Sequence, residues 1–122
     1  MYKITSLGAE PKQEITVLLS DTSRVVFNFE YKANQLGWFF GFKYGNYSVQ
    51  NMRLTTNYNI LESFRSYIPF GLRCDTPDNE EPYDIEDFAR GYASVYVLTD
   101  EDKKIIESKY YSRDEVVNAQ VW

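Results

Sequence analysis

Apolar and polar residues alternate along most of the first half of the chain, which is the pattern of strands with one buried face. Residues 13–20 alternate in this way, and residues 24–32 repeat the pattern after a short polar turn, so together they predict a hairpin. Residues 38–44 and 47–54 continue the pattern on either side of Gly45-Asn46, a two-residue signal of a tight turn. The first half of the chain therefore predicts an antiparallel meander.

The character of the chain changes near residue 58, where helical spacing replaces alternation. Asn59 and Glu62 have the spacing of a capping box, so we expect a short helix over residues 59–66 that Pro69 brings to an end. Residues 84–90 predict a further helical turn, because an aspartate begins the segment and a glycine follows it.

Shorter strand patterns occupy the rest of the chain. Residues 2–6 and 72–74 each fit a short strand, and residues 92–99 fit a central strand because they are apolar on both faces. Residues 104–110 fit either a strand or a helical turn. Six or seven short strands with one or two short helices predict a mainly β domain, either a small antiparallel barrel or a sandwich. Closure into a barrel would leave no free strand edges.

The composition agrees with one β-rich domain. The chain has 122 residues, the size of one domain, and 17% of them are aromatic. The net charge of −5 and the lack of a Lys/Arg block argue against nucleic acid and anionic membranes as partners, since both are bound through clustered cations. No stretch approaches the roughly 18 apolar residues of a membrane span. The start lacks a signal-peptide pattern and the lone Cys74 fits a reducing compartment, so we expect synthesis in a cytoplasm.

Residue types that carry catalysis or bind metals are scarce. The sequence has no His, so the usual Cys–His pairing that activates a thiol cannot form. The acidic loop at residues 75–87 lacks the glycine and the order of a calcium loop, which favours a solvated loop and leaves a cation site there open. No glycine run has the form of a phosphate-binding loop. The sequence therefore predicts no catalytic residue, cofactor or metal ligand, and an enzyme built on the acidic loop is a distant alternative.

The aromatic segment 38–42 has two interpretations. Exposed rings on a sheet can stack on sugars or bases, whereas buried rings fill a core. Trp38, Phe40 and Phe42 share one strand face, and we expect them in the core. Phe39 lies on the opposite face beside Gly41, where a glycine inside a strand indicates a bulge, a bend or a close backbone approach. A small ligand-binding module, for carbohydrate or single-stranded nucleic acid, is therefore the alternative function.

The order of these segments is more informative than any one of them. An early hairpin is followed by an aromatic strand and its turn, a short helical segment, a Pro-Phe-Gly motif, an acidic loop, and an arginine before a Tyr/Val-rich strand. In this sequence the segments are Ile15–Tyr31, Trp38–Phe42 with Gly45, Asn59–Phe64, Ile68–Gly71, residues 75–87, and Arg90 with Tyr92–Leu98. In this order the chain resembles the baseplate plug family of contractile-tailed phages, over roughly residues 2–99.

The resemblance implies a fold and a role. It implies a small barrel of the OB kind over residues 1–99, with residues 100–122 as a C-terminal extension packed on the domain or on a partner. It also implies a structural virion protein and not an enzyme, synthesised in the bacterial host cytoplasm and mounted in the tail baseplate where tube and hub meet. Its partners would be other tail proteins and further copies of itself.

A role in assembly requires interface area, and aromatic side chains are the usual anchors of protein interfaces. The side chains that we expect at an interface are Phe39, Tyr44, Tyr47, Tyr110, Tyr111 and Trp122. The residues that we expect to be structural are Trp38, Phe40, Phe42, Pro69, Gly71 and Arg90, the last through a pair with Asp84 or Asp87.

Overall fold

The predicted meander forms a four-stranded antiparallel sheet in the computed structural model, which describes residues 1–19 and 21–108. Its strands lie side by side in chain order: β2 (Lys12–Leu18), β3 (Arg24–Lys32), β4 (Gly37–Tyr44) and β5 (Tyr47–Arg53). Gly45 has a φ of +57° in the two-residue turn between β4 and β5, a conformation that glycine adopts without steric cost.

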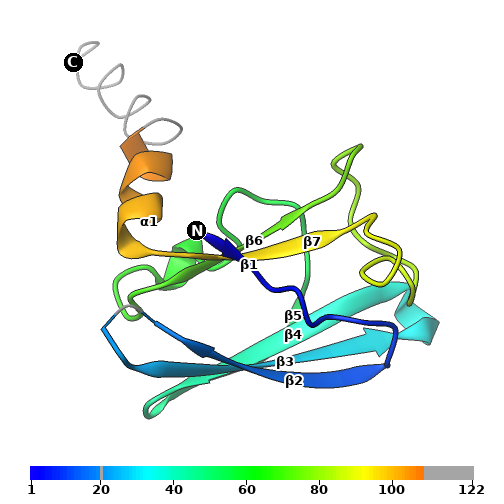
Figure 1. Ribbon diagram of the computed structural model, residues 1–122, viewed down its shortest axis with the longest axis horizontal. Helices are drawn as coiled ribbons and strands as arrows, with labels where there is room; N and C mark the ends of the chain where they lie inside the picture. The colour runs from blue at the N-terminus through cyan, green and yellow to red at the C-terminus, as the bar shows by residue number, and fades with distance from the viewer. Residues whose placement is uncertain (20, 109–122) are drawn as a thin grey trace.

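The shorter strand patterns form a second antiparallel sheet, which lies above the first in Figure 1. Its strands, in spatial order, are β1 (Tyr2–Lys3), β7 (Ser94–Leu98) and β6 (Gly71–Asp75). β7 is the central strand, as its apolar faces predicted, and its Val95 and Val97 side chains are fully buried. The structure therefore confirms the mainly β class.

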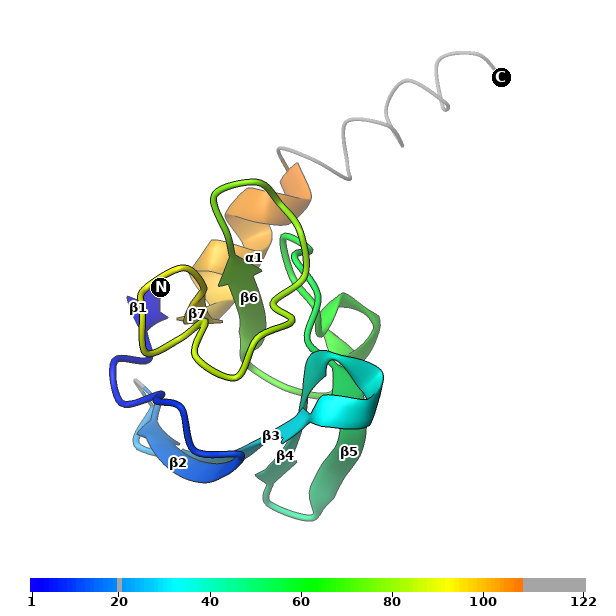
Figure 2. The same cartoon turned by 90° about the vertical axis from the view of Figure 1, so that its right-hand side faces the viewer.

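The two sheets do not close into the expected OB-like barrel. No ladder joins them among the described residues, and Figure 2 shows them as two separate layers. The chain crosses from β5 to β6 through an irregular segment that makes one isolated backbone hydrogen bond to each sheet. The Leu54 N–H donates to the Trp38 carbonyl and the Ile60 N–H to the Leu72 carbonyl, both at 2.8 Å. A closing strand would need a continuous ladder here. The architecture is instead an open two-sheet sandwich.

The core is a layer of aromatic side chains between the two sheets. Trp38, Phe40 and Phe42 of β4 are fully buried, which confirms the prediction for this face. Phe70, directly before β6, meets the rings of Phe42 and Phe27 edge-on, with centroids 5.3 Å and 5.8 Å away. Because burial of a phenylalanine side chain contributes about 1.5–3 kcal/mol, this layer is a large part of what holds the sheets together.

A bulge bends the hairpin of β4 and β5 at Gly41. The pairing register shifts between Phe40 and Phe42, and Asn51 on β5 has a φ of +59°. A Cβ on Gly41 would lie 2.6 Å from the Val49 carbonyl oxygen, so the close approach of the two backbones requires glycine. The sequence offered a bulge, a bend or a close approach at Gly41; the structure shows the close approach at Gly41 and the extra residue of the bulge opposite it on β5.

The predicted helix over residues 59–66 is shorter than expected, whereas the helical turn expected over residues 84–90 is present, with the Arg90 N–H bonded to the Glu86 carbonyl. Residues 59–66 contain one 3-10 turn, η2 (Glu62–Phe64), and residues 84–90 form successive turns without a helix. A further 3-10 turn, η1 (Ala33–Gln35), joins β3 to β4. The helix prediction for residues 59–66 was therefore wrong in extent, and the polar residue at the start of that segment also bonds outside it.

That residue is Asn59, which is buried and bridges two segments. Its Oδ1 accepts from the Leu61 N–H at 3.1 Å and from the Leu72 N–H of β6 at 3.2 Å. A Cβ on Gly71 would lie 2.6 Å from the same oxygen, which explains why glycine precedes Leu72. Asn59 therefore holds the start of its own turn and also ties the crossing segment to the edge of β6.

The α-helix α1 (Asp100–Ile106) begins before the segment that fitted either a strand or a helical turn, residues 104–110, and includes its first three residues. Thr99 caps it, since its Oγ1 accepts from the Asp102 N–H while the Asp102 carboxylate accepts from the Thr99 N–H. The amino terminus of Met1 forms an ion pair with Asp102, so the first and last described elements lie together.

Lys103 attaches α1 to the domain. Its side chain is buried, and its Nζ donates to the carbonyl oxygens of Ile68 at 2.9 Å and Arg65 at 3.3 Å. The Asp100 carboxylate, 3.3 Å away, supplies the opposite charge. A buried ammonium group is tolerated because it is both paired and hydrogen-bonded.

Replacing Lys103 with methionine should lower the free energy of unfolding by about 1–3 kcal/mol, because the Arg65 and Ile68 carbonyls lose their donor. Lys104→Met on the exposed side of the same helix is the matched control and should change it by less than about 0.5 kcal/mol. Urea unfolding followed by circular dichroism measures both. Equal effects of the two variants would show that α1 is not attached through Lys103.

Candidate interaction surface

A stack of aromatic rings leads from the core to the surface at one edge of the four-stranded sheet. Tyr47 stacks on the buried Phe42 with centroids 6.1 Å apart, and Tyr67 stacks on Tyr47 at 5.8 Å with the planes within 10°. Phe64 of η2 meets Phe42 and Tyr47 edge-on at 6.4 Å and 6.2 Å. We call Tyr47, Phe64 and Tyr67 the aromatic surface.

Tyr67 is the outermost ring of the aromatic surface and is 68% exposed. Its hydroxyl makes no hydrogen bond within the described part of the chain. Tyr47 beneath it is half-buried and rests on the core, so the exposed ring is supported from behind. A supported tyrosine can bury a large apolar area against a partner and still offer its hydroxyl for a hydrogen bond.

Tyr67 was not among the predicted interface residues. It lies directly after the segment predicted as a helix, residues 59–66, and its exposure depends on how η2 packs on β5. The spacing of Phe64 and Tyr67, three residues apart, places both on one side of a helical turn and is the signal that could have found them.

The structure places the predicted interface residues in different surroundings. Tyr44 and Tyr47 flank the turn between β4 and β5, and Tyr44 meets the Phe70 ring edge-on at 5.6 Å. Phe39 lies on the outer face of the same sheet. The remaining three, Tyr110, Tyr111 and Trp122, lie outside the described residues.

Phe39 is already covered by cations of its own chain. The Lys32 Nζ lies 4.7 Å from the ring centroid and the Arg53 guanidinium 5.4 Å from it. Arg53 is fixed in turn by the Glu81 carboxylate at 2.7 Å, and it lies over Gly37, where a Cβ would come within 2.8 Å of its Nη2. The interface role of Phe39 stays a prediction, and this contact gives the ring a role within the sheet.

The acidic loop is organised by Asp87, whose importance the sequence did not reveal. Asp87 is buried, and its Oδ2 accepts from the N–H groups of Tyr83 and Asp84 at 2.9 Å each. Arg90 pairs with Asp87 at 3.1 Å and lies 3.9 Å from Asp84, so the expected pairing is present. The Arg90 side chain is 57% exposed, which makes the carboxylate the more deeply integrated partner.

Asp78 and Thr76 of this loop also bind groups of their own chain. Asp78 accepts from the Tyr92 hydroxyl, which lowers the pKa of Asp78 and raises the pKa of Tyr92 to about 12. Thr76 bonds the Glu80 carbonyl at 2.8 Å. The described residues contain no group of three or more potential metal ligands. Residues 77–81 of the loop are exposed, which agrees with the solvated loop that the sequence predicted, and bonds among its own side chains give it a defined shape.

Cys74 lies in the core on β6. Burial, reinforced by Asp75 and Asp87, raises the pKa of its thiol to about 12. A thiol that stays protonated at neutral pH is a poor nucleophile, so this residue has the character of a small apolar core side chain.

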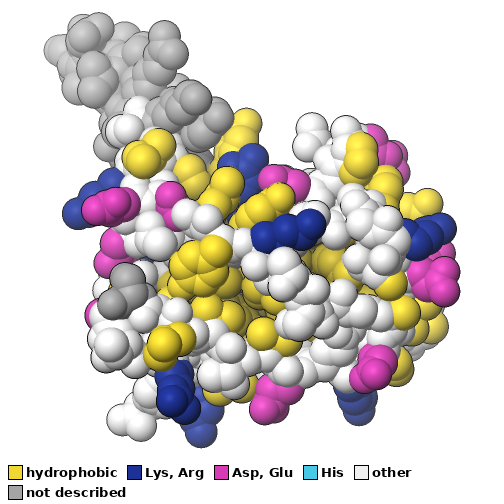
Figure 3. All heavy atoms as spheres, in the orientation of Figure 1, with side chains coloured by type: hydrophobic (Ala, Val, Ile, Leu, Met, Phe, Trp, Pro, Cys, Tyr) yellow, Lys and Arg dark blue, Asp and Glu magenta, His cyan; other side chains and the backbone are white. Residues whose placement is uncertain are grey.

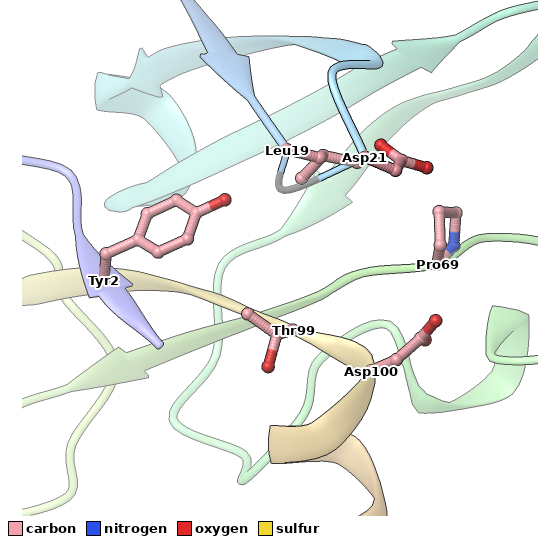
Figure 4. A pocket seen from close by; sticks show the side chains of 6 residues that line it. All are labelled: Tyr2, Leu19, Asp21, Pro69, Thr99 and Asp100. Carbon is pink, nitrogen blue, oxygen red and sulfur yellow. The ribbon is translucent and has the colours of Figure 1, made fainter.

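The hollow drawn in Figure 4 is small and has mixed lining. It measures about 100 Å³, and its walls come from β1, the β2–β3 turn, the segment before β6 and the start of α1. Ligand sites usually enclose about 300–1,000 Å³ and converge several polar groups on the ligand. Apolar side chains also gather across the middle of the face in Figure 3, with charged groups around them. The volume of this hollow does not favour a small-molecule site there.

The fold and the aromatic surface describe a small two-sheet β protein whose clearest surface feature is a supported group of rings. None of its described helices has the length and apolar character needed to cross a bilayer. Residues 1–101 match the family described as cyanophage baseplate Pam3 plug gp18. No match was found among curated proteins.

Because the match spans most of the chain, the chain belongs to this family of phage baseplate plugs. This confirms the resemblance seen in the order of the sequence segments. The family supports a structural role in the virion, at the tail baseplate, with other tail proteins as partners.

Replacing Asp87 with alanine should lower the free energy of unfolding by about 2–4 kcal/mol, because two backbone N–H groups lose their acceptor. Arg90→Ala removes the half-exposed partner and should lower it by less than about 1 kcal/mol. Thermal and urea unfolding would measure both. A larger loss for Arg90→Ala than for Asp87→Ala would contradict the assignment of Asp87 as the organising residue.

The Cys74 thiol should make stability depend on pH only in alkaline solution. Its folded pKa of about 12 lies above the ordinary 9.0, so below pH 9 the thiol is neutral in both states. Between pH 9 and pH 12 only the unfolded thiol ionises, and stability should fall as pH rises. In urea titrations, the free energy of unfolding of Cys74→Ala should fall less between pH 9 and pH 12 than that of the wild type. Iodoacetamide should alkylate the wild-type thiol only as fast as the protein unfolds. Rapid alkylation of the folded protein at pH 9 would refute the assignment.

Proposed function

We propose that this protein is a non-enzymatic component of a contractile phage tail baseplate, or of a related injection machine, and acts through protein–protein contacts where tube and hub meet. Its partners are other tail proteins and further copies of itself, and it is synthesised in the bacterial host cytoplasm before assembly. The observation that carries the proposal is the aromatic surface on a chain of the baseplate plug family.

The geometry of the aromatic surface supports a role in binding a protein. Interfaces are anchored by a few aromatic side chains, and Tyr is among the residues most enriched there. Tyr67 is held by stacking on Tyr47, so it loses little side-chain freedom when a partner covers it. The stack projects outward and does not line a hollow, which fits a flat protein partner better than a sugar or a base.

The ligand-binding alternative finds less support. The core-facing rings of β4 are fully buried and cannot stack on a ligand. Phe39 on the outer face is covered by Lys32 and Arg53. The chain also carries a net charge of −5, which opposes the approach of a nucleic-acid backbone.

The test is binding of the purified chain to the tail proteins encoded by neighbouring genes, measured by co-purification and then by calorimetry. Tyr67→Ala should weaken the binding of a partner roughly ten-fold or more, because it removes a supported anchor. Its unfolding temperature should stay close to that of the wild type, since the side chain is mostly exposed.

The matched control is Tyr83→Ala, which removes another exposed tyrosine outside the aromatic surface. It should leave binding unchanged. If neither variant affects binding to any tail protein, or if both weaken it equally, the aromatic surface is not the binding site. Complementation of a phage that lacks this gene would then show whether particles still need the protein at all.

A further inference from the structure

The four edges of the two sheets are protected to very different degrees. In the three-stranded sheet, β1 is two residues long, and Asn59 with Ile60 covers Leu72 on β6. In the four-stranded sheet, β5 is interrupted by its bulge, where Asn51 has a positive φ. These are known ways to prevent strand addition at an edge. The seven-residue β2 has no bulge and no proline, and it forms the remaining edge.

The hydrogen-bond phase of β2 shows which of its backbone groups face away from β3. The Tyr31 N–H donates to the Pro11 carbonyl and the Leu19 N–H to the Ser23 carbonyl, both at 2.8 Å. These two bonds lie at the two ends of the pairing between β2 and β3. Because bonded and outward-facing residues alternate along an antiparallel strand, the backbone groups of odd-numbered β2 residues bond to β3 and those of even-numbered residues point outward. The outward groups belong to Lys12, Glu14, Thr16 and Leu18.

Most of these outward groups are unused. Within the described part of the chain, the backbone groups of Lys12, Glu14 and Thr16 that face outward make no hydrogen bond, and the Leu18 carbonyl has only the Tyr2 hydroxyl at 3.5 Å. The side chains of these residues are exposed. The edge therefore offers a row of donors and acceptors that an added strand would pair.

The core-facing row of β2 is also incompletely covered. Ile15 and Val17 are only half-buried, whereas Phe27 and Val25, their partners on β3, are completely buried. An added strand would bring further side chains alongside Ile15 and Val17 and reduce their contact with water. Both the backbone and the apolar row therefore indicate that the sheet can continue past β2.

We infer that β2 pairs with β2 of a second copy, antiparallel, about a twofold axis at Ile15. The alternation of outward backbone groups fits this axis. The axis places the outward N–H and C=O groups of Glu14 opposite those of Thr16 in the other copy, and those of Lys12 opposite those of Leu18. Ile15 then lies beside its own copy in the core-facing row. No like charges are directly opposed across this pairing, whereas moving the axis one residue toward the N-terminus would oppose Glu14 to itself.

This pairing gives a geometry to the self-association named in the proposed function. It is argued from the β2 edge and can be measured on the purified chain without other tail proteins. The wild type should show a reversible monomer–dimer equilibrium in sedimentation velocity over a dilution series. Thr16→Pro should be monomeric, because it removes an outward N–H while leaving the ladder to β3 intact. Circular dichroism establishes that this variant is folded.

Charge variants at Leu18 test the register and stay clear of the fold, since that side chain is 60% exposed. Leu18→Lys places a lysine opposite Lys12 and should weaken the dimer roughly five-fold, and Leu18→Glu should tighten it by a similar factor. These signs are opposite to those expected from overall charge, because the lysine makes an acidic chain less acidic. Ser48→Lys on the exposed face of β5 is the matched control and should leave the dissociation constant unchanged.

A wild-type chain that remains monomeric at the highest concentration would overturn the pairing. So would a dimer that survives in Thr16→Pro, or Leu18 variants that shift the dissociation constant in the same direction. Any of these results leaves the binding of other tail proteins through Tyr67 untouched. If the wild-type chain forms the dimer but binds no tail protein, the proposed function is refuted and the β2 pairing stands.

Discussion

The rest of the structure depends on the packing of Phe70 between two sheets that no ladder connects among the described residues. Its ring meets Phe27 and Phe42 of the four-stranded sheet, and its backbone leads directly into β6 of the other sheet. In a closed barrel, backbone hydrogen bonds would set the distance between these strands. In this open sandwich the distance between the sheets is set by the volume of the buried side chains. The aromatic layer therefore determines both the stability of the domain and the spacing of its sheets.

The same layer determines where the surface features lie. Tyr47 rests on Phe42, so the aromatic surface stands at the β5 edge, and β2 forms the opposite edge of the same sheet. A tail protein bound at the aromatic surface would therefore leave the β2 edge accessible, and a second copy paired at β2 would leave the aromatic surface accessible. A baseplate component has several neighbours, and separate surfaces on one rigid sheet suit that requirement.

Much of the fold could be predicted because alternation is a local property of the chain. The strands of the meander, the buried face of Trp38 and the bulge at Gly41 follow from residues close in sequence. The candidate site was predicted only in part. Tyr47 was found, but Tyr67 was missed, since its exposure depends on how η2 packs against β5. Asp87 was one acidic residue among several until burial distinguished it.

The sequence by itself determined which segments are strands and which side of each is apolar, because successive side chains of an extended chain point to opposite sides whatever surrounds them. Only the tertiary structure decided that the sheets stay open, that Asn59 bonds β6 as well as its own turn, and that Lys103 is buried. These outcomes depend on contacts between residues far apart in the chain. A short polar side chain can satisfy its hydrogen bonds in several ways, and only the packing of the whole domain selects among them.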